Sequence, residues 1–427
     1  MNILVVSPML PYPPDNGGAA RLYNLYSRLA RQHAITWICP VWEGEEANVP
    51  GAEQFCRQVV RLPLGEQRPL PERGWAGLLK KGVAHLHWER LFVYCFGYVQ
   101  APGIYWLPAT PERLETVAQT FAEGDFDLVV SEFEGNAELI PPTLRVPRVL
   151  STHNVLSSIF NRIRGAGTVS REDRLFAGLD LQKIIRYEKK NYAAYDGAVA
   201  VSAEDQRVLR QRCPALAVEI IPNGVDVARF HPGDLPVDEH TMVYVGNYNY
   251  PPNADAVLYF CREIFPRVRS QEKDARLVLV GANPPAELAG LEGVERAGFA
   301  ADISPFVQRA GMMVVPLRLG GGSRLKILDG LAMGKAIVST TIGAEGLNVT
   351  HGENIWLADQ PEDFAAAALR LMADPQTRER LGANGRALVE LAYDWNILAG
   401  RMNAWFEQVV REYHARAQKS ERQRAQG

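Results

Sequence analysis

A glycine-rich corner with charged neighbours stands out between residues 317 and 340, in the stretch LRLGGGSRLKILDGLAMGKAIVST. The run from Gly320 to Gly322 predicts a turn, and Ser323 can cap a helix that ends at Gly334. The start of a helix offers unpaired backbone N–H groups and the positive end of the helix dipole. Both favour binding of a phosphate group. A glycine run before a helix is also a common plain loop, so this pattern alone leaves that alternative open.

Two cations and a carboxylate accompany the glycines. Arg318 and Lys326 could neutralise a diphosphate through charge-assisted hydrogen bonds. Asp329, one helical turn after Lys326, could accept hydrogen bonds from ribose hydroxyls. We therefore predict a nucleotide-diphosphate site in which Arg318, Lys326 and the amides of Gly322 and Ser323 stabilise charge on a leaving diphosphate.

Alternating strand and helix patterns indicate what positions these residues. Short apolar runs predict a first series of strands at residues 2–7, 34–40, 126–132, 148–154, 197–202 and 218–226, and a second at 241–247, 275–282, 312–317 and 335–346. The polar stretch 230–240 is the predicted linker. The fold class predicted is α/β, with two doubly wound Rossmann-like domains facing a central cleft. Ligands of such sheets bind at the carboxyl ends of the strands.

Two further groups lie at predicted strand ends. Gly17 and Gly18 follow the first strand and precede a helix predicted over 20–31, where small residues and free N–H groups could approach a ligand. His153 ends another strand. A plain strand-to-helix turn and a structural histidine are the alternatives, and the residues alone do not decide between them.

Composition excludes several classes of protein. The chain has 427 residues and a formal net charge of -3, which argues against nucleic acid as its partner. Its five cysteines are scattered and predict reduced thiols rather than disulfides or a zinc site. His85 and His87 lack a third ligand nearby, so no metal site is expected. The amino-terminal apolar run is too short for a signal peptide or membrane span, which predicts a cytoplasmic protein, with membrane association left open.

The stretch 317–340 resembles the donor site of GT-B glycosyltransferases, specifically glycosyltransferase family 4, the group 1 glycosyl transferases. The resemblance covers nearly the whole chain. It extends to GNYNYPPNADAVLYF, AGFAADISPF, IIPNGVDVARFHPG and HNVLSSIFNRI, which lie at 246–260, 297–306, 220–233 and 153–163.

The resemblance implies roles for residues of the second domain. The family has two glutamates with seven residues between them, one contacting the sugar and one the ribose. Asp329 takes the second position, whereas Gly321 takes the first, so that carboxylate is absent. Asn247 stands where many relatives have a phosphate-binding arginine, and Phe299 lies in the segment implied to hold the nucleobase.

For the first domain, the resemblance implies that Gly17 and Gly18 approach the diphosphate and sugar, and that His153 contacts the sugar or the acceptor region. Closure of the domains would bring these three residues over the sugar. The aromatic-rich stretch 82–106 could form helix core, an acceptor groove or a membrane-facing patch.

The activity implied is transfer of a sugar from a nucleotide-diphospho-sugar, without a cofactor or metal, to a saccharide or lipid-linked acceptor. Retention, a role in cell-surface polysaccharide synthesis and peripheral contact with the inner membrane are implied as well. A nucleotide-sugar 2-epimerase and a non-catalytic sugar-nucleotide binder remain alternatives. The predicted domains are an acceptor-side domain over 1–235, a donor domain over 236–395, a helix over 396–417 crossing back to the first domain, and a disordered tail over 418–427.

Overall fold

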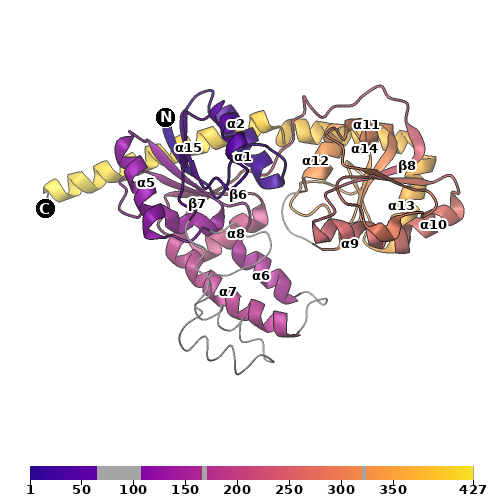
Figure 1. Ribbon diagram of the computed structural model, residues 1–427, viewed down its shortest axis with the longest axis horizontal. Helices are drawn as coiled ribbons and strands as arrows, with labels where there is room; N and C mark the ends of the chain where they lie inside the picture. Colours follow the sequence, from indigo (N-terminus) through magenta and orange to yellow (C-terminus); the bar gives the residue numbers. More distant parts are fainter. Residues whose placement is uncertain (65–106, 166–170, 320–323, 427) are drawn as a thin grey trace. The chain divides into compact units, whose positions relative to one another are not determined.

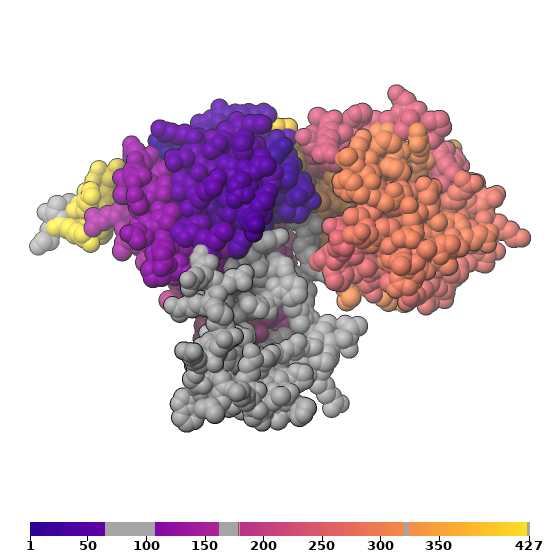
Figure 2. Space-filling view, in the orientation of Figure 1, coloured from indigo at the N-terminus to yellow at the C-terminus, as the bar shows by residue number. Residues whose placement is uncertain are grey.

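The computed structural model describes residues 1–64, 107–165, 171–319 and 324–426 (Figure 1). The chain divides into two compact units. Unit 1 contains Met1–Ile221 and Gly400–Gly427, and unit 2 contains Pro222–Ala399. Figure 2 shows the surface of unit 1 mainly from indigo to magenta and that of unit 2 from pink to orange.

Unit 1 is built on a seven-stranded parallel sheet in the order β3-β2-β1-β4-β5-β6-β7. Its strands are β1 (Asn2–Val6), β2 (Ala34–Cys39), β3 (Gln58–Arg61), β4 (Leu128–Glu132), β5 (Arg148–Ser151), β6 (Gly197–Ala200) and β7 (Ala217–Ile220). The central strands are buried along almost their whole length, as expected for a sheet covered on both faces.

Helices cover both faces of this sheet. They are α1 (Gly17–Leu29), α2 (Val49–Glu53), α5 (Pro111–Glu123), α6 (Leu156–Gly165), α7 (Arg171–Tyr192) and α8 (Ala203–Arg212), with a 3₁₀ segment η2 (Glu134–Leu139). The long helix α15 (Trp395–Gln426) begins in unit 2 and belongs to unit 1 from Gly400 onward. Its Val409 and Trp405 pack against Gly197 at the start of β6.

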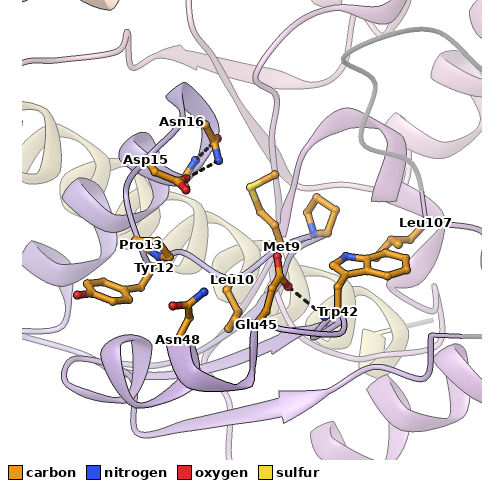
Figure 3. Close-up of a pocket in the computed structure, with 12 residues that line it drawn as sticks. Met9, Leu10, Tyr12, Pro13, Asp15, Asn16, Trp42, Glu45, Asn48 and Leu107 are labelled. Atoms are coloured by element: carbon orange, nitrogen blue, oxygen red, sulfur yellow. Dashed lines mark hydrogen bonds between the residues drawn. The ribbon is translucent and has the colours of Figure 1, made fainter. Parts of the chain in front are cut away.

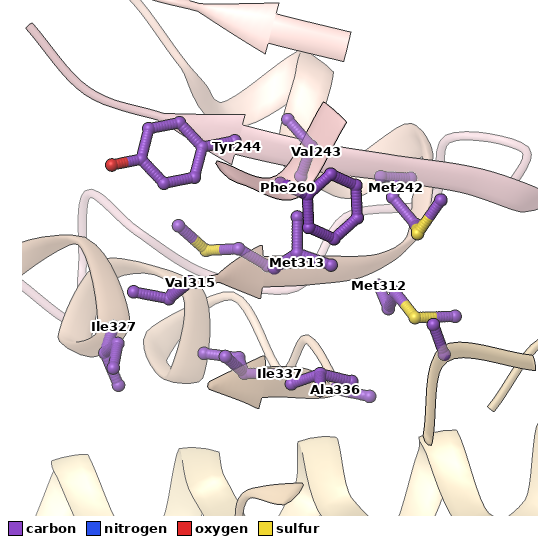
Figure 4. Close-up of a cluster of buried hydrophobic side chains, with 14 of the residues drawn as sticks. Met242, Val243, Tyr244, Phe260, Met312, Met313, Val315, Ile327, Ala336 and Ile337 are labelled. Atoms are coloured by element: carbon purple, nitrogen blue, oxygen red, sulfur yellow. The ribbon is translucent and has the colours of Figure 1, made fainter. Parts of the chain in front are cut away.

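Unit 2 is built on a six-stranded parallel sheet in the order β10-β9-β8-β11-β12-β13. Its strands are β8 (Asp238–Val245), β9 (Arg276–Val280), β10 (Val294–Gly298), β11 (Ala310–Val315), β12 (Ile337–Ser339) and β13 (Trp356–Leu357). The core lies around β8 and β11, where Met242, Met313 and Phe260 pack together (Figure 4). Tyr244 belongs to this core.

In unit 2, α9, α10 and α13 lie on one face of the sheet and α11, α12 and α14 on the other (Figure 1). Their bounds are α9 (Pro251–Tyr259), α10 (Phe265–Gln271), α11 (Ser304–Arg309), α12 (Leu325–Ala332), α13 (Pro361–Ala373) and α14 (Pro375–Ala392). Gly334 follows the end of α12 with a φ of 64°, as predicted for the residue that terminates this helix.

Both sheets reverse their strand order once, between β1 and β4 in unit 1 and between β8 and β11 in unit 2. Such a reversal leaves a crevice outside the carboxyl ends of the two central strands, where doubly wound proteins bind their ligands. Two doubly wound α/β units confirm the predicted fold class.

Several predicted boundaries differ from the structure. The strands β3, β10 and β13 were not predicted, because they are short and lie at or next to sheet edges, and their side chains do not form a buried apolar run. The helix predicted over 20–31 begins at Gly17, with Asn16 accepting a hydrogen bond from the N–H of Ala19. The glycine pair is therefore the first turn of α1 rather than a loop.

The division between units also falls earlier than the predicted 235/236 boundary, between Ile221 and Pro222. Residues of the predicted junction are held within unit 2, because the N–H of Val225 donates to the carbonyl of Tyr393 and the guanidinium of Arg386 donates to the carbonyls of Val227 and Phe230. The predicted linker 230–240 thus belongs to unit 2.

The carboxyl-terminal residues also differ from the prediction. A disordered tail was predicted over 418–427, but α15 continues to Gln426. No glycine or proline interrupts residues 418–426, and their lysine, arginine, glutamate, glutamine and alanine are good helix formers.

In the described part of the chain, the cysteines Cys39, Cys56, Cys213 and Cys261 are buried free thiols. None of the described helices is both long and apolar enough to cross a bilayer.

The turn after β9 gives a stability prediction. Gly281 has a φ of 135°, and a Cβ atom there would lie 1.9 Å from the carbonyl oxygen of Gly246 at the end of β8. We expect Gly281→Ala to cost about 2–4 kcal/mol in the free energy of unfolding, measured by urea denaturation. Gly290→Ala is the matched control, since Gly290 also has a positive φ, of 77°, but no atom within 4 Å of an added Cβ. That change should cost only about 1 kcal/mol, and equal losses at both positions would contradict the steric argument.

Candidate functional site

Lys326 lies at the switch point of the unit 2 sheet. It extends from the first turn of α12 toward the carboxyl end of β8, where its Nζ donates to the hydroxyl of Tyr244 at 2.8 Å and to Oδ1 of Asn253 at 2.7 Å. The same ammonium group stands 4.2 Å from the centre of the Tyr244 ring. Tyr244 in turn donates to Asn253 at 2.9 Å. Within the described residues, the hydrogen-bond partners of this ammonium group are therefore neutral.

This environment shifts the titration of Lys326. Burial and, to a smaller extent, the nearby positive charge of Arg324 together lower the pKa of Lys326 to about 7. Arg324 is itself buried and donates to the carbonyl of Ile342. An anion placed beside Lys326 would supply the negative charge that this site lacks.

The lowered pKa predicts a pH dependence of anion binding. A bound diphosphate favours the charged ammonium, so its binding raises the pKa of Lys326 and takes up a proton above about pH 7. We expect the affinity for a nucleotide diphosphate to be highest below pH 7 and to fall by up to about tenfold per unit above it. Calorimetry from pH 6 to 9, in buffers of different ionisation enthalpy, measures both the affinity and the proton uptake. A flat affinity over this range, without proton uptake, would contradict the prediction.

Arg318 follows β11 and lies on the other side of the switch point. Its guanidinium forms a two-point ion pair with Asp255, with distances of 2.6 and 3.2 Å. It also lies over the ring of Tyr259, 4.2 Å from the ring centre. The arginine side chain is 48% exposed, so an incoming anion can reach it. Asp255 and Asn253 both lie on α9, so this one helix holds the partners of Arg318 and of Lys326.

The other donor-side predictions are placed as follows. Asn247 lies in the loop after β8, and its carbonyl accepts from Nδ2 of Asn253 at 2.8 Å. Phe299 follows β10 and is 78% exposed. Gly321, Gly322 and Ser323 lie outside the described residues, and the residue that precedes α12 as its N-cap is Arg324 rather than the predicted Ser323.

Asp329 does not pair with Lys326, although the sequence places the two one turn apart. The Lys326 ammonium is directed to Tyr244 and Asn253 instead. Burial raises the pKa of Asp329 to about 7, and the positive charge of Arg229 partly offsets this shift. Within the described ranges, no hydrogen bond or ion pair engages its carboxyl group, which stays available to a ligand.

In unit 1, His153 is the centre of a buried polar cluster at the carboxyl ends of β4 and β5. Its Nε2 lies 2.9 Å from Oε2 of Glu132, the last residue of β4. The other carboxylate oxygen of Glu132 accepts from the hydroxyl of Tyr26 at 2.5 Å. Burial lowers the pKa of His153, an effect that Glu132 partly offsets. A neutral His153 that donates from Nε2 to Glu132 keeps Nδ1 as an acceptor.

Two more charged groups complete the cluster. Arg21 on α1 is fully buried, and burial lowers its pKa to about 10 while the charge of Glu132 opposes that shift. Glu134 accepts from the backbone N–H groups of His153 and Asn154 at 3.0 and 3.3 Å. Burial raises the pKa of Glu134 to about 7. The Glu134 side chain, in the segment that follows β4, thus fixes the backbone of His153.

Phe133 lies between Gly18 and His153 and contacts both. The ring of Phe133 stacks on the His153 ring with a centre-to-centre distance of 3.7 Å. An added Cβ on Gly18 would lie 3.1 Å from Cζ of the same phenylalanine. Gly17 and Gly18 therefore lie at the start of α1, which follows the central strand β1, and Gly18 is linked to His153 through Phe133.

Several residues of these clusters were not predicted. Tyr244, Asn253 and Asp255 fix the two cations. Glu132 binds His153, and Tyr26 donates to Glu132. One signal was available in the sequence, since Glu132 is a charged residue that directly ends an apolar strand. His85 and His87 lie outside the described residues, and the described parts of the chain contain no group of three or more potential metal ligands.

The fold is that of GT-B glycosyltransferases. Sucrose-phosphate synthase from Thermosynechococcus elongatus superposes with a TM-score of 0.66 at 16% identity, covering 96% of this chain and 99% of that one. Anabaena HepE, in a complex with UDP, gives a TM-score of 0.62 at 15% identity and covers 96% of this chain and 100% of its own.

Sequence comparison then places the chain in a family. The pattern of Glycosyltransferase Family 4 matches residues 15–229, and that of group 1 glycosyl transferases matches 239–374. The chain belongs to glycosyltransferase family 4 and is a glycosyltransferase.

Two of its relatives illustrate the range of the family. A GDP-mannose-dependent alpha-(1-6)-phosphatidylinositol monomannoside mannosyltransferase of Mycobacterium tuberculosis is 23% identical, over 92% of this chain and 94% of the relative. D-inositol 3-phosphate glycosyltransferase of Rhodococcus jostii is 26% identical over 46% of this chain and 49% of its own length.

Proposed function

We propose that this glycosyltransferase transfers a sugar from a nucleotide-diphospho-sugar to a saccharide or lipid-linked acceptor, with retention at the anomeric carbon. The observation that carries the proposal is the pair of cations at the unit 2 switch point, where the partners of Lys326 among the described residues are neutral and Arg318 is half exposed. A diphosphate is the ligand whose charge matches this pair.

In the proposed reaction, Lys326 and Arg318 stabilise the negative charge that develops on the leaving diphosphate, which replaces the role of a metal ion. The amides of Gly322 and Ser323 assist them. Asp329 accepts from the ribose hydroxyls, and Phe299, with the loop around Asn247, binds the nucleoside.

In unit 1, Gly17 and Gly18 offer backbone N–H groups at the start of α1. His153 contacts the transferred sugar or the acceptor. Glu132 holds the His153 ring in one orientation and one tautomer, so that a fixed nitrogen faces the substrate.

The named ligands of similar proteins guide the choice of donor. HepE was crystallised with UDP and with UDP-glucose. The Mycobacterium tuberculosis relative is described as GDP-mannose-dependent. The first donors to test are therefore UDP- and GDP-sugars. The proposed setting is the cytoplasmic side of the inner membrane, with peripheral membrane contact, in the synthesis of cell-surface polysaccharide.

The experiment that tests this function is thermal unfolding of the full chain in the presence of UDP, GDP and their sugars. A nucleotide sugar at about a hundred times its dissociation constant adds about 2.7 kcal/mol of stability. The donor so identified is then incubated with saccharide and lipid-linked acceptors, and the anomeric proton of the product is observed by NMR. Stabilisation followed by transfer with retention supports the proposal. A protein that no nucleotide stabilises, or one that interconverts the free donor without any acceptor, contradicts it.

A further inference from the structure

A cavity of about 460 Å³ lies wholly within unit 1, beside the start of α1 (Figure 3). Its walls come from the segment between β1 and α1 and from the segment after β2. Met9 connects it to the predicted site, because this residue lines the cavity and its Sδ lies 3.6 Å from an added Cβ on Gly18. The cavity therefore adjoins the region of Gly18 and His153, yet no step of the proposed sugar transfer involves it.

One wall of the cavity is aromatic. Trp42 has 42% of its surface exposed, a large fraction for a tryptophan. Glu45 fixes the tryptophan's backbone, since its carboxylate accepts from the N–H of Trp42 at 3.0 Å. Tyr12 lines another part of the same cavity. An exposed aromatic face in a cavity provides a flat apolar platform of the kind that small-molecule sites use.

The polar groups of the cavity are acidic or neutral. Asp15 and Glu45 contribute carboxylates, and Asn16 and Asn48 contribute amides. Asp15 is exposed, and one of its carboxylate oxygens accepts from Asn16 at 3.0 Å. Among the described residues that line the cavity there is no lysine, arginine or histidine. This part of the protein thus has the opposite charge to the donor-side cluster of unit 2.

We propose that this cavity binds an uncharged saccharide ring of the acceptor and discriminates against a phosphorylated one. The proposal rests on the proposed glycosyltransfer and names the acceptor class for it.

The chemistry of the two faces of a sugar supports this assignment. The C–H face of a pyranose ring is apolar and can stack on Trp42, whereas its hydroxyls lie at the edge, within the range of carboxylate and amide groups. Carboxylates such as Asp15 and Glu45 accept hydroxyl donors strongly. A phosphate group, in contrast, would enter beside two negative charges without a described cation to balance it.

The test uses ligand-observed saturation-transfer NMR on the full chain with UDP or GDP present. The probes are methyl α-D-glucopyranoside and methyl α-D-mannopyranoside, compared with glucose 6-phosphate and mannose 6-phosphate. We expect at least one uncharged glycoside to bind at least about tenfold more tightly than its phosphorylated counterpart. Trp42→Ala should remove this binding, and Asp15→Asn with Glu45→Gln should reduce the discrimination at least about fivefold.

Glu43→Gln is the matched control, because Glu43 is an exposed carboxylate of the same segment that does not line the cavity. It should leave discrimination unchanged. Tighter binding of the phosphorylated sugars, no binding of either glycoside, or binding that survives Trp42→Ala would overturn the proposal.

Thermal stabilisation by nucleotide sugars is measured on the same samples, and it separates two kinds of failure. If donors stabilise the protein but the cavity variants have no effect on sugar binding, this inference fails and the proposed function stands. If no donor stabilises the protein, the proposed function fails.

Discussion

Replacement of Lys326 by methionine is expected to abolish stabilisation by nucleotide sugars, while the free protein becomes no less stable. The ammonium group is largely desolvated and has a pKa of about 7. Methionine keeps most of the side-chain volume without the buried charge, and Asn253 still accepts from Tyr244. Loss of a charge that stabilises the leaving diphosphate should lower turnover by about 10²–10³-fold. Thermal unfolding with and without the donor, and the rate of donor turnover, measure the two effects.

Lys335→Met is the matched control for this prediction. Lys335 is also a buried lysine, after the other end of α12, and its Nζ donates to the carbonyls of Gln308 and Ala310 at 3.0 and 2.7 Å. Its loss leaves these two carbonyl acceptors without their partner, so we expect a loss of about 1–3 kcal/mol in stability with unchanged donor affinity. If Lys326→Met destabilises the free protein as much as Lys335→Met and still binds the donor, the role given to Lys326 is wrong.

The second large effect is expected at Glu132. Glu132 is 1% exposed and accepts from both Tyr26 and His153. Its negative charge stabilises the charged form of the buried Arg21, whose pKa burial lowers. Glu132→Ala removes the carboxylate but leaves the buried arginine. We expect a loss of about 3–5 kcal/mol in the free energy of unfolding, measured by urea denaturation.

Tyr26→Phe serves as the comparison, because it removes one hydrogen bond of the same carboxylate and leaves every charge in place. Its expected cost is about 1 kcal/mol. Similar losses for the two variants would mean that the buried charge balance contributes little, and that hydrogen bonding alone accounts for the cluster.

Strands and helix ends can be predicted from the sequence where the signal lies in neighbouring residues. Periodic apolar runs identify most strands of both sheets, and the residue that ends α12, Gly334, follows from its type and position. The same local reasoning explains the position of Arg318, since a residue just past a parallel strand must lie at the carboxyl edge of the sheet, and Lys326 lies in the first turn of the helix that follows the same strand.

What sequence reasoning misses depends on contacts between distant residues. Lys326 meets Tyr244 82 positions away, and Tyr26 meets Glu132 106 positions away. Helical spacing places Lys326 and Asp329 one turn apart, but spacing does not say which groups outside the helix bind the ammonium. Edge strands such as β10 are missed for a different reason, since a polar, half-exposed strand lacks the apolar run that marks a buried one.

Asn253 uses both ends of its amide. Its Oδ1 accepts hydrogen bonds from Tyr244 and Lys326, and its Nδ2 donates to the backbone carbonyl of Asn247. Aspartate would lose the donor half of this arrangement. Leucine would lose both halves. The same side chain therefore fixes both the shape of the loop after β8 and the position of the Lys326 ammonium group. Any attempt to evolve a new donor preference through that loop must keep this asparagine or redesign the cation at the same time.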